Sequence, residues 1–307
     1  MKFKKPKFWD QTKLSIWSIL LLPFSFIYFF FSQINKFKKK KKFSIPIICI
    51  GNIYLGGTGK TPLAKEVFNL TRSFGKNPAF VKKYYNYLED EINFLKETGR
   101  VFSNKNRIDA IKELIKNQND IAILDDGFQD FSIKKDFSIL CFNKNQWLGN
   151  KFLIPSGPLR EGLNSLKRAN CVIINGDKDL NIERKINNIS NLKIFYSQYK
   201  PKNLNKFINK KIFAFAGIGN PTNFCDLLKK NNLDVKNFKS FPDHYNYKKE
   251  DLENMKIEAN NLGYMLVTTE KDYFRIDRNL RKDIEKFDIE LEIKEKDQLI
   301  NLIKKSL

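Results

Sequence analysis

Apolar and polar positions follow two rhythms along most of the chain, one typical of buried strands and one typical of helices. Residues 45–51 (IPIICIG) form a continuous apolar run rich in β-branched side chains, as buried parallel strands do. After a glycine-rich turn, apolar residues recur at helical spacing, at Leu63, Val67, Leu70 and Phe74. Further strands are predicted at 77–82, 100–103, 120–126, 137–142 and 171–175, with a helix at 107–118. This alternation predicts an α/β fold with a parallel sheet covered by helices on both faces.

A second alternating set begins near residue 210. It contains a predicted strand and turn at 211–219, strands at 264–272 and 288–293, a helix at 221–231, and a helical stretch at the end of the chain. Residues 176–205 are polar and rich in asparagine, which is typical of a hinge region. We therefore expect two α/β domains, at 43–200 and 201–307, the second being the smaller.

The N-terminal part has a different pattern. Residues 14–35 carry no charge, and about 20 apolar residues suffice for a helix to cross the hydrocarbon core of a bilayer. Lysines flank this segment on both sides, so we expect residues 1–42 to form a membrane helix with basic flanks. A cleaved signal peptide and a buried soluble helix are less favoured, because a lysine block follows the segment and no polar face exists for solvent. A segment bent at Pro23 and lying in one leaflet stays an alternative, and the positive-inside rule only slightly favours a cytoplasmic C-terminal side.

Charge narrows the class of partner. The chain has 307 residues, 56 Lys and Arg against 34 Asp and Glu, and a net charge of +22. About ten of these charges lie in the first 42 residues, which favours anionic headgroups and phosphorylated ligands over nucleic acid as partners. The other positive charges are spread over the rest of the chain, and its Lys-, Asn-, Ile- and Phe-rich composition also explains part of them. The four cysteines are far apart in the sequence, which favours reduced core residues over a zinc site or disulfides.

A phosphate-binding loop follows the first strand. The sequence GGTGKT lies between a buried strand and an amphipathic helix, where backbone N–H groups and the helix N-terminus favour phosphate. In such loops the lysine reaches the β- and γ-phosphates and the threonine ligates Mg²⁺. The strict pattern has glycine where this chain has Tyr54, and Gly56 and Gly57 supply the flexibility instead. The predicted nucleotide-binding residues are Tyr54, Leu55, Gly56, Gly57, Thr58, Gly59, Lys60 and Thr61.

An acidic motif ends another predicted strand. Asp125 and Asp126 follow the run IAIL, and a carboxylate in this place beside a phosphate loop holds Mg²⁺ directly or through water. A capping turn is the structural alternative. With Thr61, the motif predicts a P-loop NTPase-like enzyme that uses a magnesium–nucleotide complex, and no guanine-reading motif supports GTP.

The order of motifs along the chain resembles one family. A lysine-flanked hydrophobic segment is followed by IGNIYLGGTGKTPL, DDGFQD, LIPSGPLRE, FAGIGNP, FPDH and TEKD. In this order the chain resembles the tetraacyldisaccharide 4′-kinases of lipid A biosynthesis. The resemblance implies transfer of the γ-phosphate of ATP to the 4′-hydroxyl of a lipid A disaccharide 1-phosphate, at the cytoplasmic face of the bacterial inner membrane.

The resemblance also implies roles for single residues. Asp90 is the implied base that accepts the sugar hydroxyl proton, and His244 forms a dyad with it. Gln129 is implied beside the Mg²⁺ ligands Thr61, Asp125 and Asp126. Without the family match, Asp90 reads equally well as a solvated acid and His244 as a structural histidine.

Two arginines are candidate substrate ligands. The guanidinium groups of Arg107 and Arg160 suit the lipid phosphate or the γ-phosphate, although solvated surface arginines are the alternative. The chain departs from the family pattern at residues 82–85, where it has KKYY in place of SRGY, and at Asp130, where histidine is frequent.

Two other classes of function compete with the kinase. A membrane-anchored P-loop ATPase switch would hydrolyse ATP without a lipid acceptor, and a nucleic-acid-binding module would bind with a steep salt dependence. The kinase hypothesis predicts ATP and Mg²⁺ as cofactors. It also predicts that the protein is a monomer whose partners are the lipid acceptor and an anionic membrane surface, and that it does not bind nucleic acid.

Overall fold

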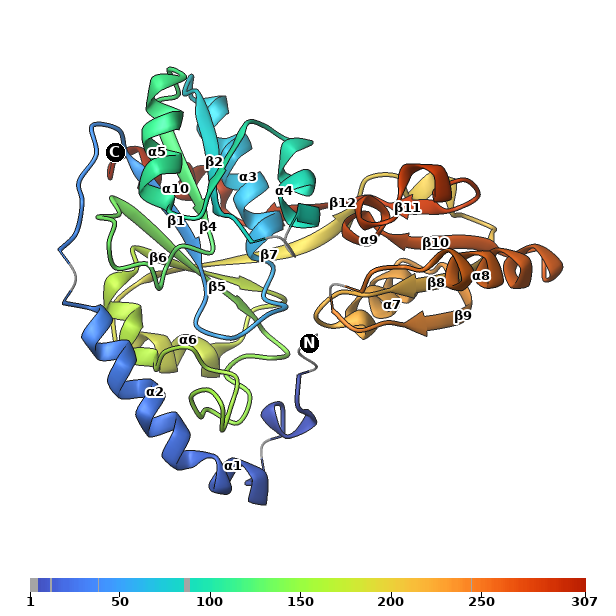
Figure 1. The fold of residues 1–307 in the computed structure, drawn as a ribbon, viewed down its shortest axis with the longest axis horizontal. Helices are drawn as coiled ribbons and strands as arrows, with labels where there is room; N and C mark the ends of the chain where they lie inside the picture. The colour runs from blue at the N-terminus through green and yellow to red at the C-terminus, as the bar shows by residue number, and fades with distance from the viewer. Residues whose placement is uncertain (1–4, 12, 38, 86–88, 244) are drawn as a thin grey trace. The chain divides into compact units, whose positions relative to one another are not determined.

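The computed structural model describes the chain except residues 1–4, 12, 38, 86–88 and 244, and it forms two compact units (Figure 1). The larger unit contains Lys5–Tyr85, Leu95–Gln198 and Leu291–Leu307. The smaller unit contains, in its described part, residues 89–94 and 199–290. The chain thus leaves the larger unit and returns to it. We expected domains formed by continuous stretches of chain, with boundaries after residues 42 and 200. These boundaries stay a prediction.

An eight-stranded sheet with the order β12-β7-β6-β5-β1-β4-β2-β3 forms the centre of the larger unit. All neighbouring pairs from β7 to β3 are parallel, which confirms the expected α/β fold with a parallel sheet. The strands are β1 (Ile47–Gly51), β2 (Pro78–Lys83), β3 (Val101–Asn104), β4 (Ile121–Asp125), β5 (Phe137–Asn143), β6 (Cys171–Asn175), β7 (Lys193–Pro201) and β12 (Ile289–Ile293).

Helices cover the sheet because the central strands bury side chains on both of its faces. Every residue of β1, β4 and β5 is buried. Apolar residues of α5 and α6 join the core on the face of Ile47 and Cys49, and α3 packs against β1, β2 and β4. After β1, the helices of the larger unit are α3 (Lys60–Ser73), α5 (Arg107–Lys116), α6 (Leu180–Asn187) and α10 (Lys296–Lys304), while α4 (Glu89–Lys96) belongs to the smaller unit up to Phe94.

The smaller unit is a four-stranded parallel sheet with the order β11-β10-β8-β9. Its central strand β8 (Lys211–Ala216) alternates its side chains between two cores, as the period of a strand requires. Ile212 and Ala214 pack in the core that includes apolar residues of α7, whereas Phe213 and Phe215 pack in the core that includes those of α8. The other elements are α7 (Pro221–Lys230), β9 (Asp234–Ser240), α8 (Lys249–Asn261), β10 (Met265–Thr269), α9 (Glu270–Arg275) and β11 (Glu285–Phe287).

The N-terminal segment corrects one sequence prediction. The uncharged run forms two helices, α1 (Ile16–Leu20) and α2 (Leu22–Asn35), with Leu21 between them. Pro23 lies in the first turn of α2, where its ring and missing N–H prevent a continuous helix through Leu21. Within the part of the chain that the structure describes, no helix has both the length and the apolar character needed to cross a membrane. The prediction of one continuous membrane helix over this segment is wrong, because Leu21 divides the segment into α1 and α2.

The surface of α1 and α2 has an unusual arrangement of side chains. Ser18 and Ser25 are buried against the rest of the larger unit, whereas Phe26 is 73% and Phe30 63% exposed. Soluble surface helices place their apolar side chains inward, so these two helices are reversed. Their outer face is a large apolar patch of the kind that marks an interaction surface.

Candidate nucleotide-binding site

The glycine-rich loop connects β1 to the first turn of α3, as the sequence predicts. Gly56, Gly57 and Gly59 have φ values of 80°, 66° and 89°, in the left-handed region that glycine adopts without strain. The side-chain amide of Asn52 donates to the Thr58 hydroxyl at 2.8 Å and also to the Tyr54 carbonyl, and thereby fixes the curve of the loop. The loop presents the N-terminus of a long helix, which favours a phosphate group.

The two residues at the start of the loop contact protein groups. The Tyr54 ring is fully buried and its hydroxyl donates to Asp10, while the Leu55 N–H donates to the Pro158 carbonyl at 2.9 Å. These contacts anchor the loop, and the nucleotide contacts predicted for both residues stay a prediction.

Thr61 and Asp125 meet at the carboxyl end of β4. The Thr61 hydroxyl donates to Asp125 Oδ2 at 3.3 Å, and the buried ammonium of Lys82 donates to the same oxygen. Asp125 Oδ1 is buried and has no hydrogen-bond partner in the described part of the chain. A carboxylate with a spare oxygen beside a loop hydroxyl fits Mg²⁺, which proteins bind with one or two carboxylates together with substrate phosphates. The described residues contain no group of three His, Cys, Asp or Glu side chains that could hold a metal ion.

Asp126 is the centre of a second set of contacts. Arg160 donates to both of its carboxylate oxygens, at 2.8 and 3.2 Å, and the Lys60 ammonium lies 3.8 Å from Oδ1. Burial opposes ionisation of Asp126, but the charges of Lys60 and Arg160 outweigh it and hold its pKa well below the usual range. The carboxylate is therefore anionic at neutral pH and holds Lys60 and Arg160, two predicted phosphate ligands, beside the loop.

Gln129 orients Arg160. Its side-chain oxygen accepts from Arg160 at 3.2 Å, and its nitrogen donates to the Asn52 carbonyl at 2.9 Å and to Glu161 at 3.1 Å. Its predicted role as a neighbour of Mg²⁺ stays a prediction. Glu161 in turn accepts from Arg168 at 2.5 Å, so this carboxylate is paired as well.

Arg107 begins α5 and points its guanidinium to the acidic motif. It donates to the Asp126 carbonyl at 2.7 Å and to Asp130 at 3.2 Å. Arg107 and Arg160 thus converge on Asp126 from two different segments, which places both predicted phosphate ligands at one site. Asp130 has a clear structural role here, because it fixes Arg107.

Sequence reasoning missed three members of this cluster, namely Lys82, Glu161 and Arg168. A signal existed for Lys82, because a lysine ends the buried strand PAFVK. Glu161 ends the motif LIPSGPLRE, but nothing in the sequence indicates its pairing with Arg168, which depends on how the loop after residue 153 folds.

The proposed acid–base pair lies largely outside the described residues. Asp90 belongs by its backbone to α4, but its side chain is not among those described, and His244 is not described at all. The neighbour Glu91 accepts from Lys271 of α9 at 2.9 Å, a contact within the smaller unit.

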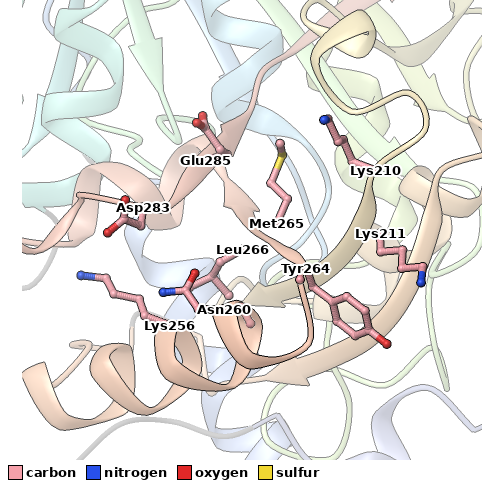
Figure 2. A pocket seen from close by; sticks show the side chains of 11 residues that line it. Lys210, Lys211, Lys256, Asn260, Tyr264, Met265, Leu266, Asp283 and Glu285 are labelled. Carbon is pink, nitrogen blue, oxygen red and sulfur yellow. The ribbon is translucent and has the colours of Figure 1, made fainter.

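A cavity of about 330 Å³ in the smaller unit contains none of the predicted residues (Figure 2). It lies where β8 and β10 begin, and Lys211, Lys256 and Tyr264 contribute to its lining. Parallel α/β sheets bind their ligands at the opposite, carboxyl ends of the strands. The predicted nucleotide-binding residues therefore lie outside this cavity.

A glycine-rich loop opening a helix, paired with an aspartate at the end of a parallel strand, defines the P-loop class of nucleotide-binding α/β proteins. A family model described as tetraacyldisaccharide-1-P 4′-kinase matches residues 17–92 and 89–307. The chain belongs to this family, and it is accordingly an ATP-dependent kinase of lipid A biosynthesis.

Individual relatives agree with this placement. The tetraacyldisaccharide 4′-kinase of Pelagibacter ubique (strain HTCC1062) is 41% identical over 308 residues, covering 98% of this chain and 97% of the relative. The enzyme of the same name from Rickettsia bellii (strain OSU 85-389) is 35% identical, covering 90% of each chain. The crystal structure of "apo" form LpxK from Aquifex aeolicus in complex with ATP has a similar fold, with a TM-score of 0.72, 24% identity, and coverage of 94% of this chain and 99% of that one.

Proposed function

We propose that the protein transfers the γ-phosphate of ATP to the 4′-hydroxyl of a tetraacyl disaccharide 1-phosphate. The observation that carries this proposal is the convergence of Lys60, Arg107 and Arg160 on Asp126 beside the glycine-rich loop. Three cations at one loop match a reaction in which negative charge is spread over a transferring phosphoryl group.

Each side chain has a definite part in this reaction. Lys60 and the loop N–H groups bind the β- and γ-phosphates, and the forked guanidinium of Arg160 positions the transferring group. Thr61, Asp125 and Asp126 would hold Mg²⁺, which neutralises phosphate charge when bound. Asp90 accepts the proton of the sugar hydroxyl, and His244 orients or assists it.

The surroundings of residue 244 support the dyad. Phe241 and Tyr245 have ring centroids 4.8 Å apart, and both rings also contact Tyr247, so the chain on either side of residue 244 is clamped. Tyr247 and Asp272 both lie beside Gly217, and Lys271, next to Asp272, donates to Glu91 of α4. Adjacent residues of α9 thus reach both segments that contain the dyad.

We further propose that the outer face of α1 and α2 lies in the cytoplasmic leaflet of the bacterial inner membrane, parallel to its surface. Exposed aromatic side chains enter the acyl region of an interfacial helix, while lysines contact anionic headgroups. Lys13 precedes the two helices and lysines 39–42 follow them. The acylated acceptor remains in this leaflet, so an enzyme held at the surface as a monomer meets it there.

The test of the reaction uses purified protein, γ-labelled ATP, Mg²⁺ and a tetraacyl disaccharide 1-phosphate in detergent. We expect a labelled lipid product, and we expect Asp90→Asn to lower its formation at least ~100-fold while ATP affinity changes little. Asp109→Asn is the control, because Asp109 forms an exposed pair with Lys112. ATP hydrolysis without any labelled lipid would refute the kinase proposal and favour the ATPase switch.

The test of the membrane surface uses sedimentation with vesicles of phosphatidylethanolamine and phosphatidylglycerol. Replacing both Phe26 and Phe30 by serine should reduce vesicle binding at least ~10-fold, because each buried aromatic ring contributes roughly 1.5–3 kcal/mol. Ile257→Ser is the matched control, since Ile257 is similarly exposed on α8. Equal binding of all three proteins would exclude this face of α1 and α2.

A further inference from the structure

Residues 153–161, here called the bridging segment, are hydrogen-bonded to α2. The Ser25 hydroxyl donates to the Leu153 carbonyl at 2.9 Å and accepts from the Ser156 N–H at 3.0 Å. Nearly one turn further along α2, the Tyr28 hydroxyl donates to the Arg160 carbonyl at 3.1 Å. Ser25 and Ser156 are both buried, so these bonds are shielded from water.

The same segment is hydrogen-bonded on its other side to the start of the glycine-rich loop. The Arg160 N–H donates to the Ile53 carbonyl at 2.7 Å, and the Pro158 carbonyl accepts from the Leu55 N–H at 2.9 Å. The Arg160 guanidinium then extends to Asp126. A continuous set of hydrogen bonds therefore joins α2 to both the loop and its arginine, within the larger unit.

The contact between α2 and the bridging segment depends on few groups. Ser18 and Ser25 are the buried residues of α1 and α2, and the Ser18 hydroxyl accepts from Asn150 at 3.1 Å. The apolar side chains of both helices face outward. Burying that outer face in lipid would hold α2 in place, and the polar contacts would then hold Arg160 and the loop.

We propose that Ser25 and Tyr28 are positioning residues that couple the lipid contact of α2 to the nucleotide site. A bilayer that fixes α2 orders the bridging segment, and this raises both the affinity for ATP and the rate of phosphate transfer. The lipid part of this inference rests on the proposed function, whereas the coupling to ATP binding does not require the lipid acceptor.

The test combines Ser25→Ala with Tyr28→Phe, which removes two hydroxyl groups and keeps the apolar face. Ser32→Ala is the matched control, because the Ser32 hydroxyl donates to Phe29 of its own helix. ATP affinity is measured with and without vesicles of phosphatidylethanolamine and phosphatidylglycerol that contain no acceptor. Vesicles should tighten ATP binding about fivefold in the wild type and the control, a change on the scale of one hydrogen bond, and less than twofold in the double variant.

Two further measurements distinguish a loss of coupling between α2 and the loop from a loss of vesicle binding. Vesicle sedimentation should be equal for all three proteins, and hydrogen exchange of residues 53–59 should slow on vesicle addition in the wild type and the control only. An equal response of the double variant in ATP affinity and exchange would overturn the coupling. Absence of a labelled lipid product from wild type would overturn the proposed function, and the ATP affinity and exchange measurements would still decide the coupling.

Discussion

The ammonium of Lys82 donates to the Oδ2 oxygen of Asp125, and both side chains are buried at the carboxyl ends of neighbouring strands. The register explains this contact, because Val81 of β2 pairs with Leu124 of β4 and the next residues of both strands follow side by side. The Lys82 charge therefore balances the aspartate that we propose as an Mg²⁺ ligand.

Replacing Lys82 by methionine should lower the free energy of unfolding by about 3–5 kcal/mol, because it leaves the buried Asp125 carboxylate without its cation. Urea unfolding at neutral pH measures this change. Lys112→Met is the control, since Lys112 and Asp109 form an exposed ion pair that contributes only ~0–1 kcal/mol. Equal stability of the two variants would show that the buried pair does not stabilise the fold.

Gly56→Ala should weaken ATP binding about tenfold. Alanine at a φ of 80° costs roughly 1–2 kcal/mol, so the loop would leave the left-handed conformation that shapes it for phosphate. Gly57→Ala should weaken it further, since its Cβ would also lie 3.0 Å from the Gln146 amide nitrogen. Gly75→Ala has the same φ of 80° outside the loop and should lower stability without changing ATP affinity. Isothermal titration with ATP distinguishes the three, and unchanged affinity in Gly56→Ala would argue against a role of the loop curve.

Asp130→Asn should reduce stability at pH 7, and the difference from wild type should shrink as the pH falls. Burial opposes ionisation of Asp130, but hydrogen bonds from Ser132 and the charge of Arg107 outweigh it and lower its pKa below 3.8. A carboxyl group with a lowered folded-state pKa stabilises fully above its unfolded value and loses this contribution as the pH falls through the folded value.

Urea unfolding of both proteins between pH 2 and pH 7 measures this difference. We expect about 1–2 kcal/mol at pH 7 and less at pH 2, below the unfolded-state pKa of an aspartate. A difference that is constant across this range would mean that Asp130 acts through shape and not through its charge.

The thiols should resist alkylation in the folded protein. Burial raises the pKa of Cys49 to about 11 and that of Cys141 to about 12, so the reactive thiolate is rare at pH 8. Mass spectrometry after iodoacetamide treatment should find both thiols unmodified in the folded protein and modified in urea. Rapid modification without urea would contradict their burial.

The sequence predicted the parts of the fold that depend on local pattern. The run IPIICIG became β1, and the glycine-rich loop with Asp125 and Asp126 came together because parallel strands end at one edge. Arg107 and Arg160 were predicted by residue type, and only the tertiary fold shows that both bind Asp126.

The missed features depend on contacts between distant segments. Residues 14–35 have the composition of a membrane helix, but composition does not show that Ser25 is bonded to a loop more than a hundred residues away. The sequence shows Lys82 as a departure from the family pattern. Its contact with Asp125 depends on β2 lying next to β4, and the sequence pattern does not give this strand order.

Strands β7 and β12 carry the chain out of the larger unit and back into it, and they are neighbours in its sheet. The Lys294 N–H donates to the Tyr196 carbonyl at 2.8 Å, and the Lys202 N–H donates to the Asp288 carbonyl at 2.9 Å. The part of the smaller unit formed by residues 199–290 is thus an insert between two strands that are hydrogen-bonded to each other in the larger unit. A tight turn of two to five residues is enough to join adjacent strands, so the insert could be removed and every strand of the host would remain connected in its original order.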